Sequence, residues 1–466
     1  MAISEDVLYL SVRELSERIR TRQLSPVELT QAYLARCKKY GHQLNAFAML
    51  MPDLALQQAH EAQDEIDQGH YRGPLHGIPY AAKDLLAVAG YPTTWGARPY
   101  QNQVFHQNAT VIRKLQDAGA ILLGKAAMIE LAGGLGYRFA AASATGAAKN
   151  PWNMNCWTCG SSSGSGAIVA SAMAAFAIGT ETWGSIVCPS AFCGVSGLRP
   201  TFGRVGRGGA MALSYSMDKI GPMCRTADDC SVVLATASGH DPLDAGSLPE
   251  AEARFSYAAP PKPLRIARIE KAWEKPDPDV AAAFEQAVAV LQQAGTAIGS
   301  VQLPEGPFET AGGIVINVEA ASAFSKLIES GDVAQLSDPL SRIGGYAAQT
   351  VSGQDFIRAQ RIRRILQQKM DAIFQQFDVL IAPSQPIGAS PLNANLETDL
   401  AFADPIGGIG NLCGLPALSV PCGFTKGGLP IGIQFLGQVL NDDAVIAAAE
   451  MYQARTDWHR KHPPLS

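Results

Sequence analysis

The feature that most constrains the fold is the run 167–176, which is rich in alanine and almost wholly apolar. A helix that is apolar all round has to be buried all round, so this run predicts a helix inside the protein. It lies between two glycine-containing stretches, 159–166 and 179–186, and each of them carries a serine. The pattern therefore predicts two loops fixed on either side of a buried helix, in a fold built from packed layers.

Helix signals and strand signals alternate along the chain. Ser11-Val12-Arg13-Glu14 is a capping box, and Ser25-Pro26-Val27-Glu28 joins an N-cap serine to a proline at the first helical position. Residues 110–118 predict a helix that Gly119 ends, and the run 120–124 predicts a strand. Alternation of this kind is typical of an α/β fold, in which helices cover both faces of a sheet. After a proline-rich segment at 258–263, the second half predicts helices at 280–294 and 354–376 and strands at 264–267 and 379–382.

Composition restricts the expected partners. The 466 residues include 47% hydrophobic and 17% charged side chains, and the net charge is −5. The lysines and arginines are spread along the chain and do not cluster. Without a basic cluster, neither nucleic acid nor an anionic membrane is an expected partner, and a small neutral substrate fits better. No apolar run approaches the roughly 18 residues of a membrane span, and residues 1–10 lack the pattern of a secretory signal. We therefore expect a cytoplasmic protein, either a monomer or a homodimer.

The nine cysteines are an odd number and are scattered through apolar contexts. This usage predicts reduced, buried thiols rather than a disulfide framework. Cys156 and Cys159 have the spacing of a zinc or redox pair, but no second pair of cysteine or histidine ligands lies nearby to complete four ligands. We expect two packed thiols there, with no metal and no cofactor.

The glycine-rich stretches are compatible with an ordinary serine hydrolase. Gly160-Ser161-Ser162-Ser163-Gly164 matches the nucleophile elbow G-x-S-x-G, with Ser162 at its centre. An elbow follows a central strand, however, and the preceding residues 150–155 are rich in turn formers. None of the eight histidines lies in a motif that would orient an imidazole toward a serine. A Ser-His-Asp triad is therefore disfavoured.

A serine without histidine needs another base, and a lysine can serve when burial disfavours its charged form. Lys83 is the candidate, because Gly77-Ile78-Pro79 makes a tight apolar entry to it. Lowering a lysine pKa from about 10.4 to near neutrality costs about 4 kcal/mol, which a buried site can supply. The alternative is a surface lysine paired with its neighbour Asp84. Spacing alone favours that alternative, because lysines are rarely buried.

Several motifs, occurring in order from about residue 10 to about residue 455, resemble those of the amidase signature family. The resemblance implies one α/β/α domain, with a large mixed twisted sheet covered by helices, in place of the three domains that length alone suggests. The motifs are G-I-P-x-x-x-K-D at 77–84, the Gly/Ser-rich run at 160–166, Gly-Ser-Ile at 184–186, Gly-Leu-Arg-Pro-Thr at 197–201, Gly-Pro-Met-Cys-Arg-Thr at 221–226, Gly-Leu-Pro-Ala at 414–417 and Gly-Leu-Pro-Ile-Gly-Ile-Gln at 428–434.

The domain implied by the resemblance covers residues 1–466. Residues 1–60 are expected to form an N-terminal helical segment, and residues 61–257 the core that holds the catalytic residues. Residues 258–466 are then the half that completes the sheet and the substrate cleft.

The resemblance also implies a Ser-cisSer-Lys triad. Ser185 is then the nucleophile, Ser161 the bridging serine on a cis peptide bond, and Lys83 the general base. The implied activity is hydrolysis of linear carboxamides through an acyl-enzyme, with esters and carbamates as further substrates. The oxyanion hole is expected to consist of backbone N–H groups from the loop before the nucleophile, those of Thr182, Trp183 and Gly184.

The nucleophile loop departs from the family pattern. Where the family usually has Asp-x-Gly-Gly-Ser, this chain has Glu181 in place of the acid and Trp183 in place of a glycine. We expect the indole to form part of the pocket wall. Val187 stands where many relatives, including the amidotransferase A subunits, carry arginine after Ser-Ile.

A further departure concerns the expected substrate pocket, where larger side chains often line the acyl site of relatives. Ala132, Gly133 and Gly134, together with Gly160, predict a roomier pocket that admits bulky or aryl amides. A Gly133→Phe substitution would then impair large substrates more than small ones. Two alternatives stay open: the A subunit of a glutamine-dependent tRNA amidotransferase, and a non-catalytic binding protein in which Trp183 blocks the loop.

Overall fold

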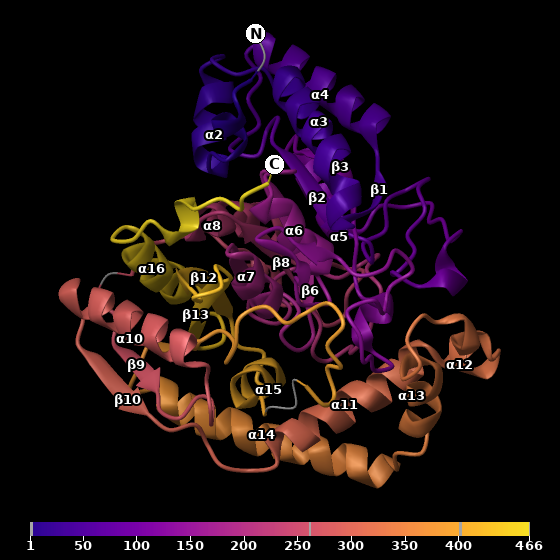
Figure 1. The fold of residues 1–466 in the computed structure, drawn as a ribbon, viewed down its shortest axis with the longest axis vertical. Helices are drawn as coiled ribbons and strands as arrows, with labels where there is room; N and C mark the ends of the chain where they lie inside the picture. Colours follow the sequence, from indigo (N-terminus) through magenta and orange to yellow (C-terminus); the bar gives the residue numbers. More distant parts are fainter. Residues whose placement is uncertain (1–2, 261, 400–402, 466) are drawn as a thin grey trace.

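A single large sheet runs through the middle of the protein. The computed structural model describes residues 3–260, 262–399 and 403–465, and among them this sheet has 11 strands (Figure 1). A separate small sheet pairs β4 (Lys149–Asn150) with β5 (Asn153–Trp157). The strands of the large sheet are, in spatial order, β1 (Phe47–Leu50), β3 (Ile121–Ala126), β2 (Pro79–Lys83), β6 (Phe176–Glu181), β8 (Lys219–Cys224), β7 (Ser196–Arg199), β12 (Ala417–Phe424), β13 (Pro430–Gly437), β11 (Val379–Pro383), β9 (Ile266–Ile269) and β10 (Ile298–Val301).

The sheet is mixed, and both halves of the sequence contribute to it. β2 pairs in parallel with β3 and β6, and β9 pairs in parallel with β10 and β11. Antiparallel pairing joins β6 to β8, β7 to β8 and to β12, and β13 to β12 and β11. The pairing of β7 with β12 continues the sheet from the first half into the second. The predicted α/β fold with a large mixed sheet is confirmed.

Helices cover both faces of this sheet, as the residues of β13 show. An added Cβ at Gly432 would touch Ala191 of α7 (Val187–Cys193), whereas one at Gly437 would touch Val445 of α16 (Asp442–Gln453). Successive side chains of a strand point to opposite faces, and these two positions differ by an odd number of residues. The first face also carries α6 (Ser163–Ala170), and the second carries α8 (Ala227–Ala237) and α10 (Pro278–Gln293).

The remaining helices lie at the periphery, and those between β10 and β11 form the lower rim in Figure 1. The two N-terminal caps are as predicted, since Ser11 accepts a hydrogen bond from the Glu14 N–H and Ser25 accepts from Glu28. The peripheral helices are α1 (Glu5–Leu8), α2 (Val12–Arg20), α3 (Pro26–Leu44), α4 (Pro52–Asp67), α5 (Thr110–Asp117), α9 (Glu250–Ala253), α11 (Phe308–Ala323), α12 (Ser325–Glu329), α13 (Ser341–Ala348) and α14 (Gly353–Phe374), with short 3-10 turns at Arg98–Tyr100, Glu130–Gly133, Asp332–Gln335 and Trp458–Arg460. The exception is α15 (Pro405–Leu412), which is largely buried and packs against α11 and α14.

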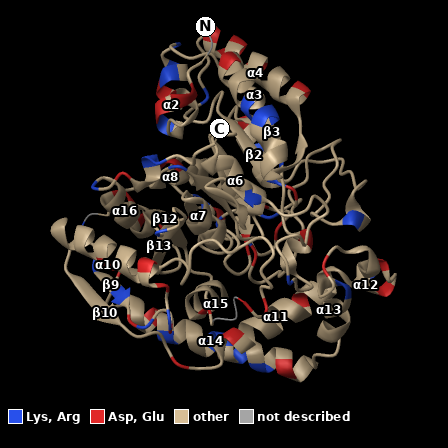
Figure 2. Ribbon diagram, in the orientation of Figure 1, with Lys and Arg blue, Asp and Glu red and all other residues tan. Residues whose placement is uncertain are grey.

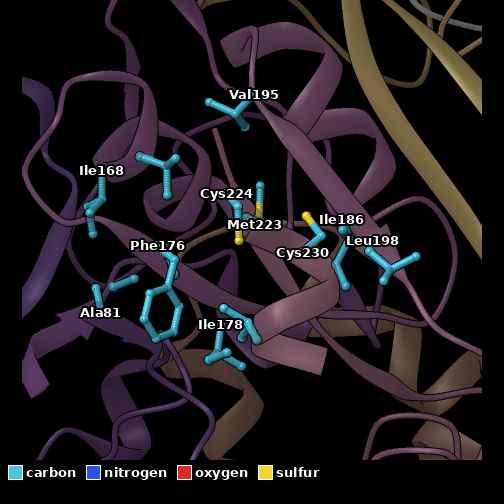
Figure 3. Packing of buried hydrophobic residues seen from close by; sticks show 14 of the residues in the cluster. Ala81, Ile168, Phe176, Ile178, Ile186, Val195, Leu198, Met223, Cys224 and Cys230 are labelled. Carbon is cyan, nitrogen blue, oxygen red and sulfur yellow. The ribbon is translucent and has the colours of Figure 1, made fainter. Parts of the chain in front are cut away.

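The apolar run that predicted a buried helix is buried, but it is only half helical. Helix α6 ends at Ala170, Ala172 adopts a left-handed φ of 53°, and Phe176 opens strand β6. Figure 3 shows Phe176 and Ile178 of β6 packed close to Ile186 and Met223 in the core. A short apolar run that is buried on every side is equally compatible with a helix and a central strand, which is why its pattern did not show where one ends and the other begins.

Charged side chains are concentrated on the outer helices. Figure 2 shows both signs intermingled on α2 and α14, with no face given over to one sign in that view. The central strands β2, β3, β6 and β8 are buried along their whole length. Within the described residues, no helix combines the length and the apolar character needed to cross a bilayer.

Candidate active site

Two parallel strands bring the predicted base to one edge of the sheet. Because β2 and β6 are parallel neighbours, their carboxyl ends meet at the same edge, where ligands commonly bind in α/β sheets. Lys83 is the last residue of β2 and is 0% exposed. Its Nζ lies 2.7 Å from Ser161 Oγ, 2.9 Å from Ser162 Oγ and 2.9 Å from Thr180 Oγ1. The amine is thus enclosed by hydroxyl groups from two segments that are distant in sequence.

Lys83 is not paired with its neighbour Asp84. The Asp84 carboxylate lies 2.9 Å from the Nζ of Lys125, on β3, and accepts a hydrogen bond from the Thr94 N–H. Lys125 also donates to Thr93 Oγ1 at 2.9 Å. The buried carboxylate that follows Lys83 is therefore neutralised by another lysine, and Lys83 keeps no carboxylate within ion-pair distance among the described residues. This excludes the surface-pair alternative.

Burial lowers the pKa of Lys83 to about 7, although the negative charges of Asp218 and Glu181 act in the opposite direction. An ammonium group loses its water shell on burial, and hydroxyl groups repay only part of that loss. A substantial fraction of the Lys83 side chains is therefore the neutral amine near neutral pH. A neutral amine is able to accept a proton, which an ammonium group cannot.

Ser161 enters the site on the predicted cis peptide bond, which joins Gly160 to Ser161. The chain then turns into α6, and close packing fixes the first turn of that helix. An added Cβ at Gly164 would lie 2.3 Å from the carbonyl oxygen of Ala46 and 2.5 Å from the backbone nitrogen of Ala127. Only glycine fits so near another backbone. The Ser161 loop is therefore part of the packed interior and is not a flexible linker.

Ser185 lies on the loop between β6 and α7, and Glu181 holds that loop. One carboxylate oxygen of Glu181 accepts hydrogen bonds from the backbone N–H of Ile186 at 2.8 Å and of Val187 at 3.0 Å. The other accepts from Arg199 at 2.7 Å and from Asn411 at 3.1 Å. Burial alone would raise the pKa of Glu181, but Arg199 and these hydrogen bonds lower it to about 2. The carboxylate is therefore charged and ties both ends of the loop to β7 and α15.

The backbone N–H groups inside this loop are left available. In residues 3–260, 262–399 and 403–465, no hydrogen-bond acceptor faces the N–H of Trp183, Gly184 or Ser185. Gly184 adopts a φ of 77°, a left-handed conformation that favours glycine. Ser185 itself is 8% exposed. The loop thus presents unpaired donors next to a partly accessible serine, which is the arrangement that stabilises an oxyanion.

The two serine loops meet over Gly179 of β6. An added Cβ at Gly179 would lie 3.0 Å from Ser162 Oγ and 3.3 Å from a side-chain carbon of Ile186, the residues that follow the two predicted catalytic serines. A disulfide between Cys159 and Cys188 also joins the loops, with their Cα atoms 5.9 Å apart. The prediction that all cysteines are reduced thiols is therefore wrong for this pair. Nothing in the sequence spacing indicated it, because the pairing depends on the two loops coming together in space.

A cavity of about 160 Å³ opens beside this edge of the sheet. Thr180, whose hydroxyl touches Lys83, and Thr182 of the nucleophile loop line its inner end. Its outer end is lined by Tyr215 and Leu243, which are 55% and 63% exposed. Most of the other lining side chains are apolar: Leu85, Ala132, Ala210, Met211, Ala212, Leu213 and Ile220.

The structure separates the four residues predicted to line the substrate pocket. Ala132 lines the cavity. An added Cβ at Gly133 would instead meet the Tyr137 ring at 2.6 Å, one at Gly134 would meet Leu213 and Phe324, and one at Gly160 would meet Ile129 and Trp157. Gly133 also has a φ of 85°, so a phenylalanine there would be strained whatever the substrate. The substitution that tests the pocket belongs at Ala132.

Comparison with known proteins agrees with these motifs and this geometry. The sequence profile of the amidase family matches residues 28–446. The chain belongs to the amidase signature family. It is 34% identical to the A subunit of the glutamyl-tRNA(Gln) amidotransferase from Picosynechococcus sp., over 98% of this chain and 100% of that protein.

Solved structures of the amidase signature family share the fold. The native peptide amidase from Stenotrophomonas maltophilia is 30% identical, with a TM-score of 0.84 over 98% of both chains. A bacterial aryl acylamidase of the same family superposes with a TM-score of 0.87 over 97% of this chain and 98% of that one, at 23% identity. The family match establishes an enzyme class that acts on amide C–N bonds.

Trp183, which replaces a family glycine, turns away from the cavity. Its indole N–H donates to Asp404 at 2.9 Å, and the ring packs between α11 and α15. Added Cβ atoms at Gly312 and Gly408 would lie 2.6 Å and 2.8 Å from ring carbons, so the two glycines make the space for the ring. Trp183 is not among the residues that line the cavity, although the sequence predicted that its indole would form part of the pocket wall. Instead, the ring fixes the nucleophile loop to two helices of the second half.

The sequence did not indicate the residues that hold Glu181. Arg199 was visible only as part of a motif, and Asn411 carried no signal of its own. Val187, which stands where relatives carry arginine, is buried in an apolar cluster that also includes Met217 and Leu412. The cation that faces the loop carboxylate thus comes from β7.

Among the described residues, no group of three or more His, Cys, Asp or Glu side chains is close enough together to hold a metal ion.

Replacing Arg199 with methionine tests this anchor. The change leaves the Glu181 carboxylate buried without its charged partner, so we expect the free energy of unfolding to fall by about 3–5 kcal/mol. Arg268→Met is the control, because its partner Glu285 has a 58% exposed side chain and such a pair contributes less than about 1 kcal/mol. Urea denaturation measures both, and equal losses would show that Glu181 does not depend on Arg199.

Proposed function

We propose that this protein is a serine amidohydrolase that cleaves the C–N bond of linear carboxamides through an acyl-enzyme, with esters and carbamates as further substrates. Ser185 is the nucleophile, Ser161 the bridging serine and Lys83 the general base. The observation that carries the proposal is the buried Lys83 amine, which lies 2.7 Å from Ser161 Oγ and has a pKa of about 7. A base of that pKa is matched to proton transfer near neutral pH.

The hydrogen bonds around Lys83 support one direction of proton transfer. Ser162 donates its hydroxyl hydrogen to the Thr180 carbonyl at 3.1 Å, so Ser162 Oγ has to accept from Lys83. A neutral amine has two N–H donors and one lone pair. In the structure Nζ donates to the hydroxyls of Ser161, Ser162 and Thr180, as an ammonium group does. In the neutral amine we propose that Ser162 and Thr180 keep the two donors and that the lone pair accepts the hydroxyl hydrogen of Ser161. Among the described residues no hydrogen bond joins the Ser161 and Ser185 hydroxyls, and the transfer of the Ser185 proton to Ser161 Oγ is proposed for the complex with substrate.

In the proposed reaction, Ser185 Oγ attacks the substrate carbonyl while its proton passes to Ser161 and the proton of Ser161 passes to Lys83. The N–H groups of Trp183 and Gly184, with Thr182 before them, supply donors to the oxyanion that forms. The relay then reverses and protonates the leaving amine as the C–N bond breaks. Water repeats the sequence on the acyl-enzyme and releases the carboxylic acid.

The cavity supports an acyl group of limited size. An apolar protein cavity of about 150 Å³ holds one benzene molecule, and this one measures about 160 Å³. We therefore propose single-ring aryl and short branched aliphatic acyl groups. This is a narrower class of substrate than the bulky amides expected from the sequence. Arg207, Asp218, Lys219 and Asp244 also line the cavity. Asp244 pairs with Arg207, hydroxyl and backbone N–H donors satisfy Asp218, and burial lowers the pKa of Lys219 well below its usual value. A neutral acyl group fits such a lining.

The amidotransferase A subunit remains the second candidate, because full-length relatives at 34% identity carry that name. The absence of an arginine after Ser-Ile, with Val187 packed in an apolar cluster, favours the first proposal. The third possibility, a binding protein whose loop is blocked by Trp183, is opposed by the position of the indole between α11 and α15.

Activity of the purified chain tests the proposal. With no other protein added, we expect hydrolysis of single-ring aryl amides and labelling of Ser185 by a fluorophosphonate, both lost in Ser185→Ala. Ser163→Ala is the control, since its hydroxyl bonds only the Ala127 carbonyl, and it should still be labelled. Activity that needs a further protein chain would favour the amidotransferase. Absence of both hydrolysis and labelling would favour the binding protein.

The pH dependence of kcat/KM tests the role of Lys83. Because burial lowers its pKa to about 7, the amine is protonated and inactive below that pH and free above it. We expect kcat/KM for an aryl amide to rise about tenfold per pH unit below pH 7 and to level off above it. Lys83→Arg, which stays protonated, should lose activity at every pH. A limb centred near pH 10 would show that burial does not lower the pKa of the base, and a profile that stays level from pH 5 to pH 9 would show that the Lys83 amine is not the base.

Ala132→Phe tests the size of the acyl site. The new ring would enter the cavity, so we expect kcat/KM for a benzoyl amide to fall at least about tenfold more than for an acetyl amide. Ala132 already has a left-handed φ of 54°, which Ala132→Gly tolerates, and this variant serves as the control that keeps or widens the cavity. Equal losses for the two substrates would place the acyl group elsewhere.

A further inference from the structure

We propose that the Cys159–Cys188 disulfide is a positioning element of the reaction, which holds Ser161 and Ser185 in register for proton transfer, so that reducing it lowers turnover without unfolding the protein. This inference rests on the proposed function. Cys159 lies just before Ser161, and Cys188 lies just after Ser185 in the first turn of α7. The bridge is therefore the shortest covalent path between the two loops.

The Cys188 end of the bridge is firmly attached to the nucleophile loop. The Cys188 N–H donates to the Gly184 carbonyl at 2.8 Å, and Gly184 directly precedes Ser185. Glu181 holds the following turn through Ile186 and Val187. A displacement of the Cys188 sulfur would therefore be transmitted to the loop that carries both the nucleophile and the oxyanion donors.

The Cys159 end has fewer other attachments. Cys159 adopts a left-handed φ of 63°, which is uncommon for a residue other than glycine. In this segment the Ser161 carbonyl accepts one hydrogen bond, from the Ile129 N–H at 3.2 Å, while the Thr158 hydroxyl bonds only nearby carbonyls. The side-chain contact of Ser161 with Lys83 is a single hydrogen bond. After Ser161, the chain is held by the hydrogen bonds of Ser162 to Thr180 and Lys83 and by the close packing of Gly164. The disulfide is thus the constraint that ties the segment before Ser161 to the nucleophile loop.

The fold itself does not depend on the bridge. Helices α6 and α7 also pack directly, since an added Cβ at Gly166 would lie 3.0 Å from Cys193 Sγ and 3.0 Å from the Pro189 carbonyl. The β2–β6 ladder and the Glu181–Arg199 pair hold the strands and the end of the loop. Reduction is therefore expected to loosen two loops and to leave the sheet and the helices in place.

The chemistry of reduction is simple. A dithiol reductant supplies two electrons and two protons; the S–S bond breaks, two thiols form at Cys159 and Cys188, and the reductant becomes its own disulfide. The two cysteines are 8% and 7% exposed and lie at the edge of the site. An oxidised disulfide such as oxidised glutathione reverses the change. A misplacement of about 1 Å in a catalytic group costs on the order of 100-fold in rate, so the expected loss in kcat is about 10- to 100-fold.

The experiment measures kcat and KM for a single-ring aryl amide in three states of the wild-type protein: as oxidised, after dithiothreitol, and after reoxidation with oxidised glutathione. Peptide mapping without reductant establishes the state of Cys159 and Cys188 in each. We expect kcat to fall about 10- to 100-fold on reduction, with KM changed less than about threefold, and to recover on reoxidation. Near-UV circular dichroism should show that the reduced protein keeps its packing.

Two variants separate this disulfide from the other cysteines. The double variant Cys159→Ala/Cys188→Ala is expected to have the low kcat of the reduced protein and no response to dithiothreitol. Cys156→Ala is the control, because Cys156 is an equally buried free cysteine close in sequence to Cys159. It should respond to reductant as the wild type does.

Three outcomes overturn the proposal. A protein that mapping shows to be reduced and that keeps its full kcat would show that the bridge has no positioning role. A loss of near-UV signal parallel to the loss of kcat would show that the bridge stabilises the fold and does not act on the positions of the two serines alone. A double variant that folds and keeps the kcat of the oxidised wild type would also contradict it, and if that variant does not fold, the reversible wild-type experiment still decides. Failure of the proposed function is distinct, because the oxidised protein would then neither hydrolyse substrate nor react with the fluorophosphonate.

Discussion

The site depends on keeping one amine uncharged inside the protein. Lys83 is fully buried at the end of a central strand, and hydroxyl groups rather than carboxylates surround it. A carboxylate in contact would stabilise the ammonium form and raise the pKa of Lys83. The nearest one in sequence, Asp84, is neutralised by Lys125 on β3. The buried carboxylate next to Lys83 in sequence therefore has a cation of its own, and the charges that act against burial on the pKa of Lys83 are those of Asp218 and Glu181.

In the loop that carries Ser185, by contrast, the buried group keeps its charge. Glu181 is as buried as Lys83, yet Arg199, Asn411 and two backbone N–H groups make its ionised form the stable one. Hydrogen bonds to a charged group are stronger than those between neutral groups, so one carboxylate can fix a loop that has little other structure. The compensating cation, Arg199, comes from β7, and Val187 lies in an apolar cluster.

The extent to which the sequence predicted this structure differs between its parts. Local signals were sufficient for the capped helices at Ser11 and Ser25. Motifs indicated Lys83 and Ser161, which lie 2.7 Å apart, while their catalytic roles and that of Ser185 stay a prediction. The sequence did not predict contacts that join residues far apart in the chain. Asp84 had a nearer lysine in sequence than the one it pairs with, and Cys159 pairs with a cysteine on another loop. The run 167–176 changes from helix to strand within one buried stretch, where hydrophobicity carries no boundary.

The proposed oxyanion loop has to meet two opposing requirements, and in this chain the residues that restrain it lie before and after the loop. The N–H groups of Trp183 and Gly184 must stay free to act on a substrate, so these residues cannot be fixed by their own backbone hydrogen bonds. The restraint comes from Glu181 before them, from the Trp183 side chain between α11 and α15, and from the first turn of α7 after them. A side chain that replaces glycine in such a loop therefore need not block the site, because it can hold the backbone while leaving the amide exposed.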